Sequence, residues 1–148
     1  MTSTIDKTKP IDSSLITAAE LRNNFVAASN DIEALQANQG ATAGLLSKSL
    51  AYTTILTDAN KQILHPSSDT SARVFTIADN SSVAYPLGTT LTFLNQNSAG
   101  SLTITTTSDT MRLAGAGTTG NRTLAPNGIA IAIKLATTEW LIYGTGLT

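Results

Sequence analysis

The spacing of apolar residues changes near residue 50, and this change constrains the fold more than any other feature of the chain. Before it, apolar residues recur at intervals of four and three, which is the period of one face of an α-helix. They are Leu21, Phe25, Ala28, Ile32 and Leu35. After it, apolar and polar residues alternate, as in a β-strand with one buried face. The sequence therefore predicts an N-terminal segment, residues 1–49, and a β module, residues 50–148.

The N-terminal segment is expected to contain an extended arm, one helix and a linker. Residues 1–14 are polar and interrupted by a proline, which favours an extended arm. Thr17 and Glu20 match a capping box, in which each side chain accepts a hydrogen bond from the other residue's backbone amide. We therefore expect a helix that begins here and ends near Asn38, followed by a linker over residues 39–49.

The apolar residues of this helix have the a and d spacing of a coiled coil, so their side chains form one stripe. One interpretation is that the stripe packs against the β module of the same chain. The other is that it docks on partner chains, as in a short bundle. Two or three heptads are only marginally stable alone, so such a bundle would depend on the β module. The candidate interface is this stripe: Leu21, Phe25, Ala28, Ile32 and Leu35.

The β module is expected to hold about eight short strands, because the period is two and turn residues recur at short intervals. The predicted strands are residues 51–56, 62–65, 73–77, 89–95, 101–107, 111–113, 129–136 and 140–143. The predicted turns are residues 58–61, 86–88, 98–100 and 126–128. No helical pattern separates the strands, so the predicted fold is mainly β, with an antiparallel β-sandwich or jelly roll.

One predicted strand, residues 129–136, has a bulky face and a small face. The bulky residues are Ile129, Ile131, Ile133 and Leu135, and they alternate with Ala130, Ala132 and Lys134. This pattern is typical of a strand that is closely packed on both sides.

The composition excludes several classes of protein. The chain has no cysteine, so it has neither a disulfide framework nor a thiol nucleophile. A small domain without such links must gain stability in another way, and self-association is the obvious one. The net charge is −1 and the basic residues are dispersed, which argues against nucleic-acid or membrane partners. No apolar stretch has the length of a signal peptide or a membrane span, so we expect synthesis in the cytoplasm.

The residues that could support catalysis or metal binding are few. His65 is the single histidine, so a metal site would need carboxylates for its other ligands, and a structural role is favoured. Asp109 and Glu139 could in principle form a carboxylate pair for glycoside hydrolysis. No catalytic, cofactor-binding or metal-binding residue is assigned, and no cofactor is expected.

Two further features have a structural and a functional interpretation. The glycine-rich residues 115–121 could cradle a phosphate, but no Lys-Ser/Thr pair and no helix start follow, so a surface loop is favoured. Trp140 and Tyr143 could form a platform on which a sugar stacks, although a core position for Trp140 is favoured.

Parts of the chain resemble bacteriophage virion proteins. Residues 15–25, followed by Asp31 and Ile32, are similar to the N-terminal helix of many phage fibre and head-decoration proteins. The β module resembles a widespread phage structural domain at residues 58–61 with Ile63, 85–89, 97–104 and 138–144. The usual glycine of the first of these turns is Asn60 here, and asparagine also accepts the left-handed conformation. The resemblance implies a virion component, commonly trimeric, that is attached by its N-terminal segment.

The expected function is that of a non-enzymatic phage virion structural protein. The leading hypothesis is a trimeric capsid decoration or cement protein that binds the major capsid protein on the outer surface of the virion, after synthesis in the host bacterial cytoplasm. The chain stops at Thr148, soon after the resembling domain, which favours this role over a longer adhesin. The alternative is a tail or head fibre adhesin that binds host surface glycans. An enzyme such as a glycan depolymerase is the third and weakest hypothesis.

Overall fold

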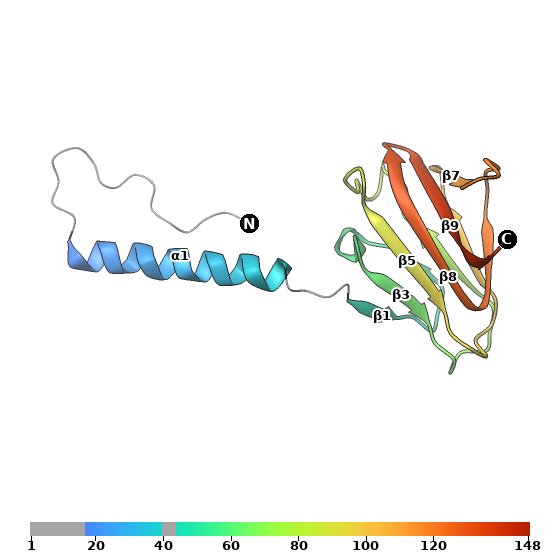
Figure 1. The fold of residues 1–148 in the computed structure, drawn as a ribbon, viewed down its shortest axis with the longest axis horizontal. Coiled ribbons are helices and arrows are strands. Elements are labelled where there is room, and N and C mark those ends of the chain that lie inside the picture. Colours follow the sequence, from blue (N-terminus) through green and yellow to red (C-terminus); the bar gives the residue numbers. More distant parts are fainter. Residues whose placement is uncertain (1–16, 40–43) are drawn as a thin grey trace. The chain divides into compact units, whose positions relative to one another are not determined.

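The computed structural model describes residues 17–39 and 44–148 (Figure 1). The chain divides into two compact units, Met1–Thr42 and Ala43–Thr148. The first contains the helix α1 (Ala18–Gln39), and the second, here called the β unit, contains the strands. The chain is thus mainly β with one N-terminal helix, as predicted, while the predicted N-terminal arm lies outside the described residues.

The helix begins and ends close to the predicted positions. The backbone amide of Thr17 donates to Glu20 Oε2 at 3.0 Å, and the amide of Glu20 donates to Thr17 Oγ1 at 3.2 Å. These reciprocal bonds confirm the predicted capping box. The helix extends one residue beyond Asn38, to Gln39.

The described part of the β unit holds nine strands and one short 3-10 helix. The strands are β1 (Leu45–Ser47), β2 (Tyr52–Thr53), β3 (Gln62–His65), β4 (Arg73–Ile77), β5 (Thr90–Asn95), β6 (Leu102–Thr106), β7 (Thr110–Leu113), β8 (Arg122–Ala136) and β9 (Glu139–Leu147), and the 3-10 helix η1 is Leu56–Asp58. Strands β3 and β4 have the predicted bounds. Strand β1 lies inside the segment that was predicted to be a linker.

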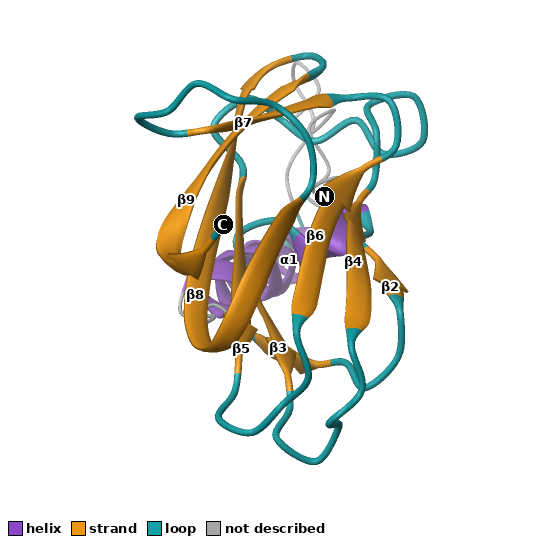
Figure 2. Ribbon diagram, turned by 90° about the vertical axis from the view of Figure 1, so that its right-hand side faces the viewer, coloured by secondary structure: helices purple, strands orange, loops and turns teal. Residues whose placement is uncertain are grey.

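The predicted antiparallel sandwich or jelly roll is wrong. The strands form one mixed, largely parallel sheet that curls into a half barrel (Figure 2). The strand order is β1-β3-β5-β8-β6-β4-β2, with β9 paired to β8 and β7 paired to β9. Five of the eight pairings are parallel.

The parallel pairs arise because the chain alternates between the two halves of the sheet. Strands β1, β3 and β5 lie in one half, and β2, β4 and β6 lie side by side in the other (Figure 2). Paired residues are 30 positions apart in β3 and β5, as in the pairing of His65 with Asn95, and closer in β1 and β3, as in the pairing of Leu45 with Gln62. Each parallel pair among β1 to β6 is therefore connected through a strand of the opposite half, whereas β7 and β9 are connected through β8. The prediction assumed instead that short turns join antiparallel neighbours, because parallel strands need a long crossover, which is usually a helix.

Strand β8 joins the two halves of the sheet. Its residues 122–124 pair with β6, and its residues 129–133 pair with β5, both antiparallel. The predicted turn at residues 126–128 lies within this strand, where the pairing with β9 shifts register and Asn127 has a φ of 63°. These residues therefore bend β8 from one half to the other and do not end it.

The core lies inside the curl, where the inward side chains of both halves meet. Its largest fully buried side chains include Trp140, Phe75 and Phe93. The rings of Phe75 in β4 and Phe93 in β5 have centroids 6.5 Å apart. Because the two halves supply these rings, their packing holds the halves together.

Candidate interaction surfaces

The predicted stripe of α1 is exposed over the part that the structure describes. The exposed fractions of Leu21, Phe25 and Ile32 are 48%, 67% and 54%. Ala28, between them on the stripe, is partly exposed. The side chain of Leu35 lies outside the described residues, although α1 includes its backbone. Three large apolar side chains thus stand uncovered along one side of the helix.

A second apolar surface lies on the outer side of β5, β8 and β9, which run side by side in Figure 1. We call it the isoleucine face, and it comprises Leu94 of β5, Ile129, Ile131, Ile133 and Leu135 of β8, and Leu141 and Tyr143 of β9. The register places Ile129 beside Leu94, Ile131 beside Tyr143, and Ile133 beside Leu141. Each of these rows across the three strands holds two apolar side chains and one threonine, and β8 supplies an isoleucine to every row.

The bulky side of β8 faces outward because the inside of the curl is already filled. Ala130 and Ala132 point inward and are fully buried beside rings such as Trp140. The outward residues Ile129 and Leu135 are 37% and 51% exposed. The sequence predicted close packing on both sides of β8. Within one chain, only the small side of β8 is closely packed, and the bulky side is not covered. Sequence reasoning missed this surface, although the alternation of bulky residues with alanine was a visible signal.

The outer side of the opposite half has a different chemistry. Its outward residues are Thr53 of β2, Val74 and Thr76 of β4, Thr103 and Thr105 of β6, and Thr123 of β8. We call it the threonine face. Threonine suits a solvated strand, because its branched Cβ favours the pleat and its hydroxyl faces water. The β unit thus has one hydroxylated face and one aliphatic face.

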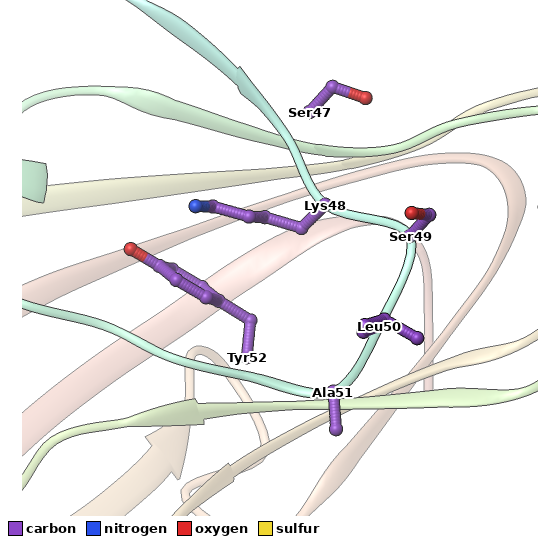
Figure 3. Close-up of a pocket in the computed structure, with 6 residues that line it drawn as sticks. All are labelled: Ser47, Lys48, Ser49, Leu50, Ala51 and Tyr52. Atoms are coloured by element: carbon purple, nitrogen blue, oxygen red, sulfur yellow. The ribbon is translucent and has the colours of Figure 1, made fainter.

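An open hollow of about 330 Å³ is lined by residues 47–52, between β1 and β2 (Figure 3). The Lys48 ammonium lies 4.0 Å from the centroid of the Tyr52 ring. The Tyr52 hydroxyl donates to Asp58 Oδ2 at 2.6 Å, and burial, followed by this carboxylate, raises the pKa of Tyr52. The single cation of this hollow is thus engaged with a ring, and the tyrosine is held in its neutral form, so the hollow offers no acid-base pair.

His65 has the structural role that the sequence favours. It is fully buried, with Nδ1 3.0 Å from Asn95 Oδ1 and Nε2 3.1 Å from Asp69 Oδ2. The Arg73 guanidinium donates to the same carboxylate through Nε at 2.6 Å. This cluster joins β3, β4 and β5 to the loop after β3. The hydrogen bond from Arg73 is the main cause that holds the pKa of Asp69 well below its usual range.

We expect the β unit to lose stability in acid because of this cluster. An unfolded aspartate titrates near pH 3.9, whereas folded Asp69 has a lower pKa. The unfolded state therefore binds the proton more readily, and the stabilisation that is present above about pH 4 is lost as the pH falls through the folded-state pKa. Asp79, whose pKa is lowered to about 2 chiefly by hydrogen bonding from Ser82, acts in the same direction.

Urea unfolding between about pH 5 and pH 2 measures this loss. The variant Asp69→Asn cannot titrate at this position, so its stability should depend less steeply on pH, and its curve should approach that of the original protein in acid. Equal steepness for the two proteins would contradict the role of Asp69.

The carboxylates considered for glycoside hydrolysis have different partners. Asp109 is buried, and its Oδ2 accepts from Lys134 Nζ at 3.1 Å and from Trp140 Nε1 at 3.2 Å. Glu139 instead pairs with Arg112 at 2.9 Å. Trp140 is fully buried, so it cannot form the considered sugar platform, and it has the favoured core position. Tyr143 remains 43% exposed on the isoleucine face.

The remaining predicted features contribute no site. Residues 115–121 form an exposed loop, as favoured, in which the Gly117 carbonyl accepts from Arg112 Nη1 at 2.9 Å. In the described ranges, no three histidine or acidic residues lie together in a way that could hold a metal ion. A helix long and apolar enough to cross a membrane is also absent from residues 17–39 and 44–148.

Comparisons with protein-family models, with curated proteins and with solved structures found no match to this chain. The candidate functional features are the two apolar surfaces, the stripe of α1 and the isoleucine face, because both leave large apolar side chains exposed.

Proposed function

We propose that this chain is a non-enzymatic structural protein of a bacteriophage virion, and that as a homotrimer it decorates the capsid and stabilises the shell of the major capsid protein. The observation that carries the proposal is the uncovered stripe of α1, in which Leu21, Phe25 and Ile32 are about half or more exposed. The resemblance of residues 15–25 and of four segments of the β unit to phage virion proteins supplies the class of particle.

The stripe provides the physical basis for assembly. Fully burying a large apolar side chain contributes about 1.5–3 kcal/mol, and the stripe offers Leu21, Phe25 and Ile32 from every chain. Helices of neighbouring copies can bury them against one another or against the coat protein. The mechanism is non-catalytic, because the area buried between chains and against the shell resists internal pressure and shear.

The structure gives the glycan-binding alternative less support than the sequence did. A sugar platform needs exposed aromatic rings, but Trp140 is buried, and Tyr143 is the exposed aromatic residue that remains on β9. We therefore keep glycan binding as an outcome of the test described below.

The variant Phe25→Asp tests the proposal in the full-length chain. It places an unpaired charge in the centre of the stripe, so we expect several kcal/mol of lost interface energy, dissociation of the trimer and loss of binding to empty capsids. Light scattering gives the mass, and cosedimentation with capsids gives the binding. The matched control is Asn30→Asp, which adds the same charge to the exposed opposite side of α1 and should change neither result.

Three results would contradict parts of the proposal. A single-chain mass for the original protein at micromolar concentration would exclude the trimer. A trimer that binds glycans and not capsids would favour the adhesin. If Phe25→Asp lowered the melting temperature of the β unit and left capsid binding intact, the stripe would pack on its own chain, which is the other interpretation of the helix.

A further inference from the structure

We infer that the isoleucine face is the surface through which the β units of neighbouring copies of this chain contact one another. The inference rests on the self-association proposed above and adds to it a location on the β unit that is separate from α1. In the proposed trimer, the isoleucine faces of the copies would meet around the common axis.

The size and continuity of the face indicate that protein covers it. Ile131 occupies the centre, between Thr92 of β5 and Tyr143 of β9 in the pairing register. Neighbouring strands lie about 4.8 Å apart, so such rows form an unbroken surface. An apolar surface that spans three neighbouring strands marks an interaction site.

The threonine face of the same unit provides an internal comparison. Thr103 occupies the centre of that face, between Val74 and Thr123 in register, as Ile131 does on the isoleucine face. Both central residues are partly exposed strand residues with branched side chains. Threonine has a strand propensity as high as that of the aliphatic residues, so strand propensity does not explain why the isoleucine face is aliphatic. Burial by a partner does explain them.

The absence of charge on the isoleucine face favours a second copy of the chain as its partner. None of the seven residues of the isoleucine face is charged, and their pairing neighbours Thr90, Thr92 and Thr145 are neutral as well. Arg112 of β7 pairs with Leu141 at the edge of the face, and its charge is matched by its ion pair with Glu139. Around a symmetry axis each residue approaches its own copies, so a charged face would bring like charges together. A neutral aliphatic face meets itself without this repulsion. It also offers nothing to a partner that binds through charge.

The border of the face along β9 is polar, as at the rim of a protein interface, whereas on the β5 side Leu94 pairs with Leu64 of β3. The ion pair between Arg112 of β7 and Glu139 of β9 lies at one edge, with both side chains partly exposed. At the pairing level of Ile129, Thr145 of β9 provides an exposed hydroxyl. An apolar centre with polar groups along this border fits a protein contact in which water is excluded from the centre of the interface and remains at this border.

The variant Ile131→Lys in the full-length chain tests the inference. A lysine in the centre of a buried neutral contact lacks a partner, so we expect the dissociation constant of the assembly to rise about 100-fold. The matched control is Thr103→Lys, which adds the same charge to the centre of the threonine face and should change it less than about 3-fold. Light scattering over a dilution series gives both constants. Equal values for the two variants would overturn the inference.

A second, more conservative variant controls for the possibility that Ile131→Lys fails to fold. Ile131→Thr keeps the branched side chain that the strand needs and removes apolar area, so we expect a rise of about 10-fold while the cooperative melt is retained. If this variant folds and associates as tightly as the original protein, the inference is wrong.

Thiol labelling gives a second readout, because the chain has no cysteine of its own. Thr145→Cys places a thiol at the border of the isoleucine face, and Thr123→Cys places one on the threonine face; both positions are exposed in the single chain. In the assembly, Thr145→Cys should react with a maleimide about 10-fold more slowly than Thr123→Cys, and dilution to single chains should remove the difference. Equal rates in the assembly would overturn the inference.

These experiments separate the inference from the proposed function. If Phe25→Asp dissociates the trimer and Ile131→Lys does not, the trimer stands and the isoleucine face is not its contact. If Ile131→Lys dissociates an assembly that does not bind capsids, the contact stands and the decoration function is wrong.

Discussion

Replacing Asp109 with alanine is expected to destabilise the β unit by about 3–5 kcal/mol, the range for breaking a buried ion pair. The Lys134 side chain is fully buried, and its ammonium lies 3.1 Å from Asp109 Oδ2. The same oxygen accepts from Trp140 Nε1 at 3.2 Å, and Oδ1 accepts from the backbone amide of Asn80 at 3.2 Å. Removing the carboxylate leaves the buried Lys134 ammonium, the buried Trp140 Nε1–H and the partly buried Asn80 amide without this partner, and each donor adds to the cost.

Urea unfolding of the full-length chain measures the loss. Adding Lys134→Met to Asp109→Ala should recover part of it, because no charge then remains buried. The comparison variant is Glu139→Ala, which breaks the partly exposed pair with Arg112 and should cost about 0–1 kcal/mol. If Asp109→Ala lowered the free energy of unfolding no more than Glu139→Ala does, the expected contribution of the buried ion pair to stability would be contradicted.

The second large effect is expected from Gly144→Ala in β9. A Cβ at Gly144 would overlap the carbonyl oxygen of Ile129 and lie 2.7 Å from the Cα of Ala130, both in the backbone of β8. Backbone atoms cannot rotate away as a side chain can, so β9 would have to move away from β8. Overpacking of this kind costs about 1–3 kcal/mol, and we expect the upper end because two paired strands must shift.

Thermal and urea unfolding test this prediction against Gly44→Ala. A Cβ at Gly44 would meet Lys61 Cδ at 3.7 Å, which is an ordinary van der Waals distance to a flexible side chain. This control should change the stability by less than about 0.5 kcal/mol. If the two substitutions had the same effect, the close approach of β8 and β9 at Gly144 would be contradicted.

The candidate site was predictable only in part. The spacing of Leu21, Phe25 and Ile32 was sufficient to predict the stripe, because the side chains of one helix turn are placed by local geometry. The isoleucine face was not predicted, because a period of two shows that a strand has two different faces and does not show which one is inside. The direction depends on Trp140 and Phe93, which fill the interior beside the small residues Ala130 and Ala132 of β8.

Local sequence patterns were sufficient to predict the features of this protein that depend on neighbouring residues. These features are the helix with its capping box, the positions of most strands, and the residues that bend the chain, since propensity, alternation and turn chemistry all act over a few positions. Asn127 shows the limit, because it bends the chain as expected and yet lies within β8.

Which strands pair depends on contacts between residues that lie far apart in the sequence. Side chains alternate in the same way in parallel and antiparallel strands, so the pattern contains no information on the pairing of His65 with Asn95, 30 residues later. Packing across the curl also decided that Asp109 meets Lys134 and that the bulky side of β8 faces outward. These outcomes depend on contacts between distant residues that fill one shared interior, and no short stretch of sequence determines how that interior is filled.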